Sequence, residues 1–167
     1  SLYLYIPNSF LIFNAFSEIL SFGMAHNIHQ TKDGSSTLYS SQFEQFYHNP
    51  NGAVSESKFV FFETSGLLSS IDKMASLTIL EVGFGTGLNF LLLLDLILDK
   101  NLQVPISFFS IEAFPIHPDT ARHIDFSKHL NHPELNELLP DIFGKLKPGM
   151  NALTDFENSK AELHLFY

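Results

Sequence analysis

The sequence predicts an α/β fold with a parallel sheet, and three of its features support this prediction. Two short apolar runs, residues 77–82 and 105–112, are typical of strands that are buried in a parallel sheet. Between them a glycine turn, residues 83–87, leads into an almost unbroken apolar segment of helix formers, residues 88–98. A strand, a crossover helix and a second parallel strand form a βαβ unit, which is right-handed in nearly all proteins.

Length and composition indicate one globular domain. The 167 residues are 45% apolar and 16% charged, which is enough apolar material to bury a core and too much for a disordered chain. Nine basic and eighteen acidic residues give a net charge of −9, which argues against a surface that coats nucleic acid without sequence preference. The sequence has no cysteine, which excludes a disulfide scaffold, a thiolate metal site and a cysteine nucleophile within these residues.

The first segment, residues 1–26, is an apolar leader of unknown role. It contains no Lys or Arg, which argues against a signal peptide, and polar residues interrupt it too often for a membrane span. Phe10, Phe13 and Leu20 fall near helical spacing. We therefore interpret this segment as an amphipathic helix or as an ill-ordered leader.

Turns and helices are expected between the leader and the βαβ unit. Residues 31–37 are a polar cluster with an Asp-Gly pair, which is typical of a turn. Aromatic residues then recur at roughly helical spacing over residues 43–47. Residues 48–52 predict a loop, and residues 53–68 predict a helix.

Two further segments follow the βαβ unit. Residues 117–160 are interrupted by four prolines, so we expect short helices and loops there. Residues 161–167 read as a third strand. We expect the three strands to be parallel neighbours, in the spatial order third, second, first.

The glycine turn has the spacing G-x-G-x-G, formed by Gly83, Gly85 and Gly87. Glycines at alternate positions let the backbone turn sharply and approach a ligand closely, and the free N–H groups of the following helix face that ligand. The dinucleotide-binding turn has the longer spacing G-x-G-x-x-G. The tighter form suits a ligand with no phosphate to wrap, such as S-adenosylmethionine. The alternative is a turn with a purely structural role.

Two carboxylates and one aromatic ring flank or form part of this turn. Glu112 ends the second strand, where the dinucleotide fold has an acidic residue that accepts hydrogen bonds from the ribose hydroxyls. Glu81 lies in the first strand, where a buried unpaired carboxylate is costly, and either a cationic ligand group or nearby backbone N–H groups would offset that cost. Phe84 could stack on adenine, or it could pack in the core.

The segment Gly83-Phe84-Gly85-Thr86-Gly87-Leu88-Asn89-Phe90 resembles the methyltransferase domain of the MnmC/MnmD family, which modifies the wobble uridine of tRNA. Other segments resemble the same family in order, so that the resemblance covers residues 28–167. Together with the arguments from single residues, it gives these candidate cofactor-binding residues: Tyr47, Glu56, Ser57, Glu81, Gly83, Phe84, Gly85, Thr86, Gly87, Asn89 and Glu112.

The resemblance implies a Rossmann-like class I methyltransferase fold, of which residues 27–167 would be the first half, incomplete at the C-terminus. It implies a cytoplasmic enzyme that binds S-adenosylmethionine and methylates the aminomethyl group of 5-aminomethyl-2-thiouridine in tRNA. The catalytic residue and the tRNA contacts would come from beyond Tyr167. We therefore expect this fragment alone to be inactive, and the far side of residues 77–82 to be an unpaired, aggregation-prone sheet edge.

Two other functions stay open. One is a truncated, non-catalytic module that binds a nucleotide or a partner, and the other is a NAD-dependent oxidoreductase, against which the G-x-G-x-G spacing argues. The eight histidines suggest a metal site, but they lack the H-E-x-x-H spacing, so we expect no metal. We also expect no membrane contact, and the sequence does not indicate an oligomeric state.

Overall fold

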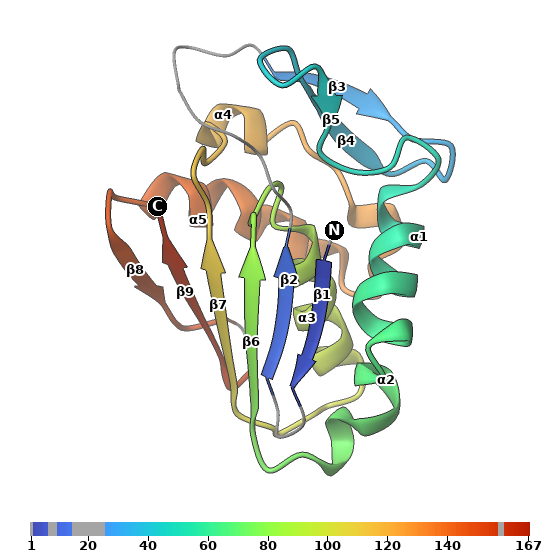
Figure 1. Cartoon of the computed structure of the whole chain (residues 1–167), viewed down its shortest axis with the longest axis vertical. Coiled ribbons are helices and arrows are strands. Elements are labelled where there is room, and N and C mark those ends of the chain that lie inside the picture. Colours follow the sequence, from blue (N-terminus) through green and yellow to red (C-terminus); the bar gives the residue numbers. More distant parts are fainter. Residues whose placement is uncertain (1, 7–9, 15–25, 157–158) are drawn as a thin grey trace.

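The structure is a computed structural model that describes residues 2–6, 10–14, 26–156 and 159–167. It contains a six-stranded sheet in the order β1-β2-β6-β7-β9-β8 and a separate three-stranded sheet in the order β3-β4-β5 (Figure 1). The strands are β1 Leu2–Ile6, β2 Phe10–Asn14, β3 His26–Gln30, β4 Ser36–Ser40, β5 Gln45–Phe46, β6 Leu77–Val82, β7 Ile106–Ile111, β8 Met150–Leu153 and β9 Ala161–Phe166.

The helices are short except for the one that follows the glycine turn. They are α1 Ala53–Ser57, the π-helical η1 Lys58–Thr64, α2 Leu67–Ser70, the 3-10 turn η2 Ile71–Lys73, α3 Leu88–Asp99, α4 Pro118–Ala121, the 3-10 turns η3 Ser127–His129 and η4 Pro133–Glu137, and α5 Leu138–Lys145. The helix predicted over residues 53–68 is thus present as α1 and η1. It is interrupted at Gly66, whose φ is +75°, and α2 begins at the next residue.

The four central strands of the large sheet, β2, β6, β7 and β9, are parallel, and the antiparallel strands β1 and β8 lie at its two edges. The spatial order β9, β7, β6 is the predicted order third, second, first. The predicted α/β class with a parallel, Rossmann-like sheet is therefore confirmed.

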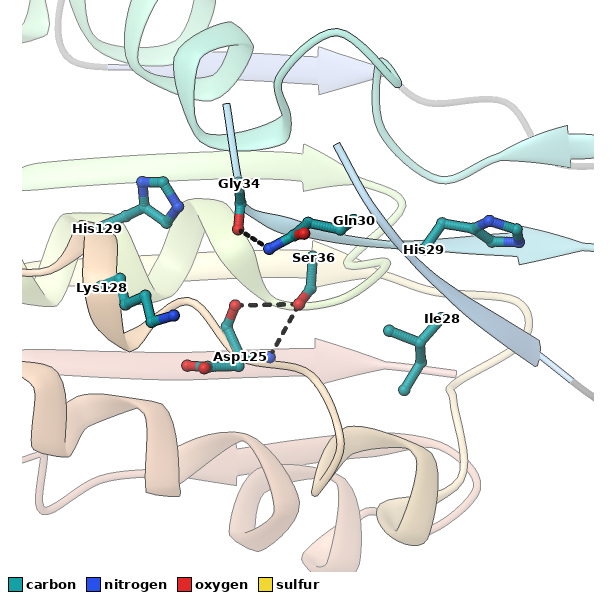
Figure 2. A pocket seen from close by; sticks show the side chains of 8 residues that line it. All are labelled: Ile28, His29, Gln30, Gly34, Ser36, Asp125, Lys128 and His129. Carbon is teal, nitrogen blue, oxygen red and sulfur yellow. Dashed lines mark hydrogen bonds between the residues drawn. The ribbon is translucent and has the colours of Figure 1, made fainter. Parts of the chain in front are cut away.

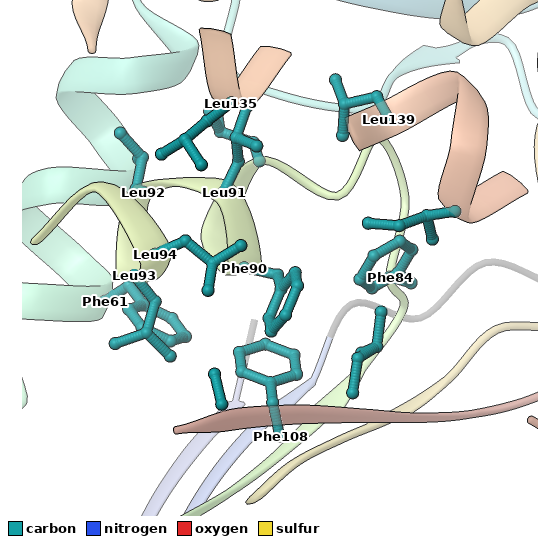
Figure 3. Close-up of a cluster of buried hydrophobic side chains, with 14 of the residues drawn as sticks. Phe61, Phe84, Phe90, Leu91, Leu92, Leu93, Leu94, Phe108, Leu135 and Leu139 are labelled. Carbon is teal, nitrogen blue, oxygen red and sulfur yellow. The ribbon is translucent and has the colours of Figure 1, made fainter. Parts of the chain in front are cut away.

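The hydrophobic core lies on one face of this sheet, between the strands and the helix α3. Eight of the twelve residues of α3 are buried. Phe90 of α3 makes an edge-to-face contact with Phe108 of β7, with ring centroids 5.2 Å apart (Figure 3). A second edge-to-face contact joins Phe90 to Phe156, with ring centroids 4.9 Å apart. Each large apolar side chain buried in this way contributes about 1.5–3 kcal/mol, so the contact between α3 and the sheet holds the glycine turn in place.

The opposite face of the sheet is covered less than the apolar runs predicted. Along β6 and β7 the side chains alternate between buried and half-exposed, because successive side chains of a strand point to opposite faces. Ile111 and Phe166, which are partners in the register of β7 and β9, are 45% and 48% exposed. In this chain β6 and β7 are therefore buried on one face and partly exposed on the other.

Four expectations were wrong. Residues 10–14 form the strand β2 rather than part of an amphipathic helix, and residues 15–25 lie outside the described residues. The aromatic residues over 43–47 lie in a turn and the short strand β5. Residues 150–153, expected within helices and loops, form the strand β8. Finally, the far side of β6 is not an unpaired edge, because β2 pairs with it in parallel, with Phe10 opposite Thr78.

Candidate functional site

The glycine turn lies between the carboxyl end of β6 and the first residue of α3. Gly83, Gly85 and Gly87 all have left-handed φ angles, +91°, +57° and +79°. Residues with a Cβ rarely adopt such angles, so each of the three positions favours glycine. The Gly83 N–H donates to the carbonyl oxygen of Ile111 at 2.7 Å, which fixes the start of the turn against the end of β7.

The third glycine of the turn is needed for packing. A Cβ placed on Gly87 would lie 3.1 Å from Leu139 of α5 and 3.1 Å from the ring of Phe84. Phe84 itself is only 3% exposed and lies within the buried cluster (Figure 3). Its ring centroid is 5.6 Å from that of Phe143. This packing supports the core role of Phe84 and gives no support to a role in stacking on adenine.

Glu112 follows the last residue of β7 and holds the middle of the turn. One of its carboxylate oxygens accepts a hydrogen bond from the Gly85 N–H at 2.8 Å, and the other accepts one from the Phe114 N–H at 2.8 Å. The side chain is 5% exposed. Because each carboxylate oxygen has two lone pairs, both oxygens can accept a further donor, such as a hydroxyl of a ligand.

Glu81 is a second buried carboxylate beneath the turn, with an exposed fraction of 3%. It accepts hydrogen bonds from the Asn89 side-chain amide at 2.9 Å and from the Ser110 hydroxyl at 3.0 Å. Its pKa is nevertheless raised to about 8. Burial is the largest cause, and the nearby charge of Glu112 contributes in the same direction. The carbonyl oxygen of the Asn89 side chain is buried and has no hydrogen-bond partner among the described residues. The pair Glu81 and Asn89 therefore has unused capacity to bind a donor.

Tyr47 follows β5 of the three-stranded sheet, called the small sheet below, and its ring lies next to the glycine turn. Its backbone N–H donates to the carbonyl oxygen of Leu38 in β4 at 2.9 Å. A Cβ placed on Gly85 would lie 3.5 Å from the Tyr47 ring, so the ring is a direct neighbour of the turn. Burial raises the pKa of Tyr47, and the carboxylate of Glu112 raises it as well. Tyr47, Gly85 and Glu112 thus lie together at the turn.

His48 is not among the candidate residues named above, but it also contacts the turn. Its Nε2 atom lies 2.7 Å from the hydroxyl oxygen of Thr86, which is completely buried. Its backbone N–H donates to the hydroxyl of Thr37 in β4 at 3.1 Å. Burial lowers the pKa of His48 to about 4, so its ring is neutral near pH 7. Two successive residues, Tyr47 and His48, therefore connect the small sheet to the glycine turn.

Glu56 and Ser57, the other two candidates, lie in α1. Glu56 is exposed, and its carboxylate accepts a hydrogen bond from the Asn49 N–H at 3.0 Å. Ser57 is buried. The described contact of Glu56 therefore holds the loop that follows Tyr47 and His48, and does not reach the glycine turn itself.

The structure also bears on metal binding and on membrane insertion. Over residues 2–6, 10–14, 26–156 and 159–167, three or more His, Asp or Glu side chains nowhere gather in a way that could hold a metal ion. In the same part of the chain, no helix has the length and apolar character needed to cross a membrane.

Together, the parallel sheet, the glycine turn after β6 and the carboxylate after β7 define a Rossmann-like α/β protein with a candidate ligand site at the carboxyl ends of its strands. No protein-family model matches the chain. Known proteins do, and they confirm the resemblance stated above: this chain is homologous to part of the MnmC proteins.

Two relatives carry the name tRNA 5-methylaminomethyl-2-thiouridine biosynthesis bifunctional protein MnmC. The protein of Leptospira interrogans is 33% identical over 137 residues, which cover 78% of this chain and 20% of the relative. The protein of Delftia acidovorans is 33% identical over 144 residues, which cover 86% of this chain and 22% of the relative. The chain therefore spans about a fifth of the length of these relatives.

A crystal structure of MnmC2 from Aquifex aeolicus is similar in fold. Its TM-score is 0.60 and its sequence identity 25%, and the match covers 86% of this chain and 43% of the MnmC2 chain. The relatives named above are enzymes of tRNA modification.

Proposed function

We propose that residues 27–167 are the cofactor-binding half of an S-adenosylmethionine-dependent tRNA methyltransferase. The observation on which the proposal depends most is the contact between Glu112 and Gly85, which joins the two sequence features of a nucleoside-binding site in one place. The substrate we propose is the aminomethyl group of wobble 5-aminomethyl-2-thiouridine, in accordance with the names of the relatives. We also propose that this reaction takes place in the cytoplasm.

The residues at the turn fit the cofactor in their donor and acceptor chemistry. The carboxylate of Glu112 is held by two backbone N–H groups and still has lone pairs for the two ribose hydroxyls. The unpaired Asn89 carbonyl oxygen offers an acceptor for the ammonium group of the amino-acid tail. Glu81 is mostly protonated near pH 7 because of its raised pKa, and an ammonium group beside it would favour its ionised form. The backbone of Gly85 leaves room that a side chain would fill.

These contacts indicate which roles belong to the cofactor and which to the residues of this chain. When bound, S-adenosylmethionine supplies an electrophilic methyl group. The residues of this chain orient the cofactor through Glu112 and the turn, and Tyr47 shields the turn from solvent. A tyrosine is protonated near pH 7, and the raised pKa of Tyr47 shifts it further from ionisation, so its phenol stays a hydrogen-bond donor. We assign no catalytic residue to this chain.

The experiment that tests this proposal is a calorimetric titration of the chain with S-adenosylhomocysteine and, separately, with NAD. We expect saturable binding of S-adenosylhomocysteine that excess NAD does not displace. Binding of NAD alone would instead support an oxidoreductase, and binding of neither compound would support a non-catalytic module. A radiolabelled methyl-transfer assay on undermodified tRNA then tests the reaction itself.

A further inference from the structure

A cluster of hydrogen bonds lies in the loop between β3 and β4, with the carboxylate of Asp33 at its centre. One carboxylate oxygen accepts hydrogen bonds from the Thr31 hydroxyl at 2.6 Å and from the Ser35 hydroxyl and N–H at 2.6 and 3.0 Å. The other oxygen accepts hydrogen bonds from the hydroxyl and N–H of Ser55 in α1, at 2.8 and 3.0 Å. The carboxylate therefore joins the β3–β4 loop, in which it lies, to the first turn of α1.

Asp33 is held in this position as an ionised group. Burial alone would raise its pKa, but the hydrogen bonds from Ser35, Thr31 and Ser55 outweigh burial and lower the pKa of Asp33 below its usual value. Hydrogen bonds to a charged acceptor are stronger than those between neutral groups, and here they reach both oxygens from two different elements. The orientation of the carboxylate is therefore fixed.

The same carboxylate packs against residues 49–52, called loop 49–52 below, which lead into α1. A Cβ placed on the buried Gly52 would lie 2.6 Å from a carboxylate oxygen of Asp33. The φ of Gly52 is 165°, an extended conformation that any residue adopts, so the contact with Asp33 is what favours glycine here. Beside it, the Lys32 N–H donates to the carbonyl oxygen of Pro50 at 3.0 Å. The β3–β4 loop thus holds loop 49–52 in place.

Loop 49–52 follows directly after the two residues whose side chains contact the glycine turn. The Tyr47 ring is a neighbour of Gly85. The His48 ring contacts the Thr86 hydroxyl. Hydrogen bonds to β4 hold the backbone N–H groups of both residues. The segment between β5 and α1 is therefore held at its start by β4 and at its end by the β3–β4 loop.

We infer that Asp33 is a positioning residue of the cofactor site, which holds the Tyr47 ring against the glycine turn through loop 49–52. This inference rests on the proposed function. Without the carboxylate, loop 49–52 loses its link to α1, and the Tyr47 ring lies against Gly85 in only a fraction of the molecules. The apparent affinity for a ligand falls by that same fraction. Asp33 thus acts on cofactor binding from the far side of the small sheet's loop, through Tyr47.

Asp125 offers a matched control. Its carboxylate accepts hydrogen bonds from the Ser127 hydroxyl at 2.6 Å and the Ser127 N–H at 2.9 Å, which is the pattern that Asp33 forms with Ser35. It lies beside the same hairpin, because the Ser36 hydroxyl donates to the backbone carbonyl oxygen of Asp125 at 3.0 Å (Figure 2). Asp125→Ala therefore removes an equivalent carboxylate next to the hairpin and leaves the contacts of loop 49–52 in place.

The first test measures binding of S-adenosylhomocysteine to the whole chain by calorimetry, at a temperature at which urea unfolding shows each variant to be folded. Asp33→Ala should raise the dissociation constant about tenfold, as expected if the ring is in place in about a tenth of the molecules. Asp33→Asn keeps one acceptor oxygen and should lose less, and Asp125→Ala should bind like the parent chain. Gly52→Ala, which keeps Asp33 but places a methyl group against its carboxylate, should reproduce the loss and serves if Asp33→Ala does not fold.

A double-mutant cycle distinguishes positioning from a general loss of stability. If Asp33 acts through the Tyr47 ring, Asp33→Ala should cause little further loss of affinity in a chain that already carries Tyr47→Ala. A second readout needs no ligand. Amide hydrogen exchange at Tyr47 and His48 should become about tenfold faster in Asp33→Ala and stay unchanged in Asp125→Ala, because the exchange rate reports the open fraction of the segment.

Three results would overturn the inference. They are an unchanged affinity in both Asp33→Ala and Gly52→Ala, an equal loss in Asp125→Ala, and a loss of the same size whether or not Tyr47 is present. A parent chain that binds no S-adenosylhomocysteine would refute the proposed function instead. Hydrogen exchange then decides the positioning role alone, and unchanged exchange at Tyr47 and His48 in Asp33→Ala would refute it.

Discussion

The substitution Gly87→Ala should destabilise the fold more than Gly66→Ala, although the two glycines have the same backbone conformation. Gly87 precedes α3 with φ +79° and ψ 8°, and Gly66 precedes α2 with φ +75° and ψ 7°. The two positions therefore impose the same conformational strain on an alanine. Their surroundings differ, because a Cβ on Gly87 would meet Leu139 and Phe84 at 3.1 Å, whereas a Cβ on Gly66 would have its nearest neighbour, the Ser69 hydroxyl oxygen, at 3.9 Å.

The size of the difference follows from these distances. Left-handed backbone costs an alanine about 1–2 kcal/mol at either position. At Gly87 the added methyl group must also displace Leu139 or Phe84, which are 0% and 3% exposed and have little room to move. Overpacking of this kind costs about 1–3 kcal/mol. We therefore expect a loss of about 1–2 kcal/mol for Gly66→Ala and about 2–5 kcal/mol for Gly87→Ala.

The assay is equilibrium unfolding in urea, with the free energy of unfolding compared at equal slope for the parent chain and the two variants. The reasoning requires Gly87→Ala to be the less stable variant by about 1–3 kcal/mol. Equal losses at the two positions would refute it, since they would mean that the tight contact with Leu139 and Phe84 has no energetic consequence.

Three further predictions concern the site. Glu112→Gln should weaken binding of S-adenosylhomocysteine by about 1.5–3 kcal/mol in calorimetry, because it removes the charge from the hydrogen bonds to the ligand, and an unchanged affinity would contradict the assignment. His48→Leu should cost about 1–3 kcal/mol in urea unfolding because the Thr86 hydroxyl loses its partner in a fully buried position, and His48→Gln should recover part of the loss. Burial raises the pKa of Glu81 from 4.5 to about 8, so its contribution to stability is complete below pH 4.5 and is lost as the pH rises through 8. The advantage of Glu81→Gln over the parent chain, measured as free energy of unfolding, should therefore grow from pH 4.5 to 8, and a shrinking advantage would contradict the raised pKa.

The βαβ unit could be predicted from the sequence because its signals are local. The apolar run of β6, the three alternating glycines and the apolar helix α3 follow each other without interruption, and each restricts the backbone on its own. The position of Glu112 also followed, because the end of a second parallel strand must lie beside the end of the first. The structure joins the two through a hydrogen bond from the Gly85 N–H to the Glu112 carboxylate.

The strands β2, β5 and β8 could not be predicted from their own residues, because each is selected by the strand with which it pairs. The apolar residues of β2 suit a helix or a strand equally well, and it is the open edge of β6 that selects a strand. The strand β8 has only four residues and is held by its antiparallel partner β9. Short elements of this kind have little local preference of their own.

The same limit applied to the site. His48 and Thr86 are 38 positions apart and Glu81 and Ser110 are 29 apart, so nothing in either local sequence indicates their contact. The one available signal for His48 was its place next to Tyr47, which the family resemblance had already selected. The assignments of Glu56, Ser57 and the other cofactor-binding residues stay predictions until a ligand is bound.

The arrangement of the sheet explains how the glycine turn is held in place while much of one sheet face is uncovered. The turn is held from the covered face by the contacts of Gly87 with Leu139 and Phe84, and from the neighbouring strand by Glu112. Tyr47 and His48 hold it from the small sheet. Ile111 and Phe166 contribute only backbone carbonyl oxygens at this end of the sheet. None of the contacts involves the side chains of the row formed by Ile111, Phe166 and Met150, which the strand registers place side by side and which are 45%, 48% and 63% exposed. Cofactor binding and the coverage of that face are therefore separable properties, and a chain that binds the cofactor does not have to bury this apolar row to do so.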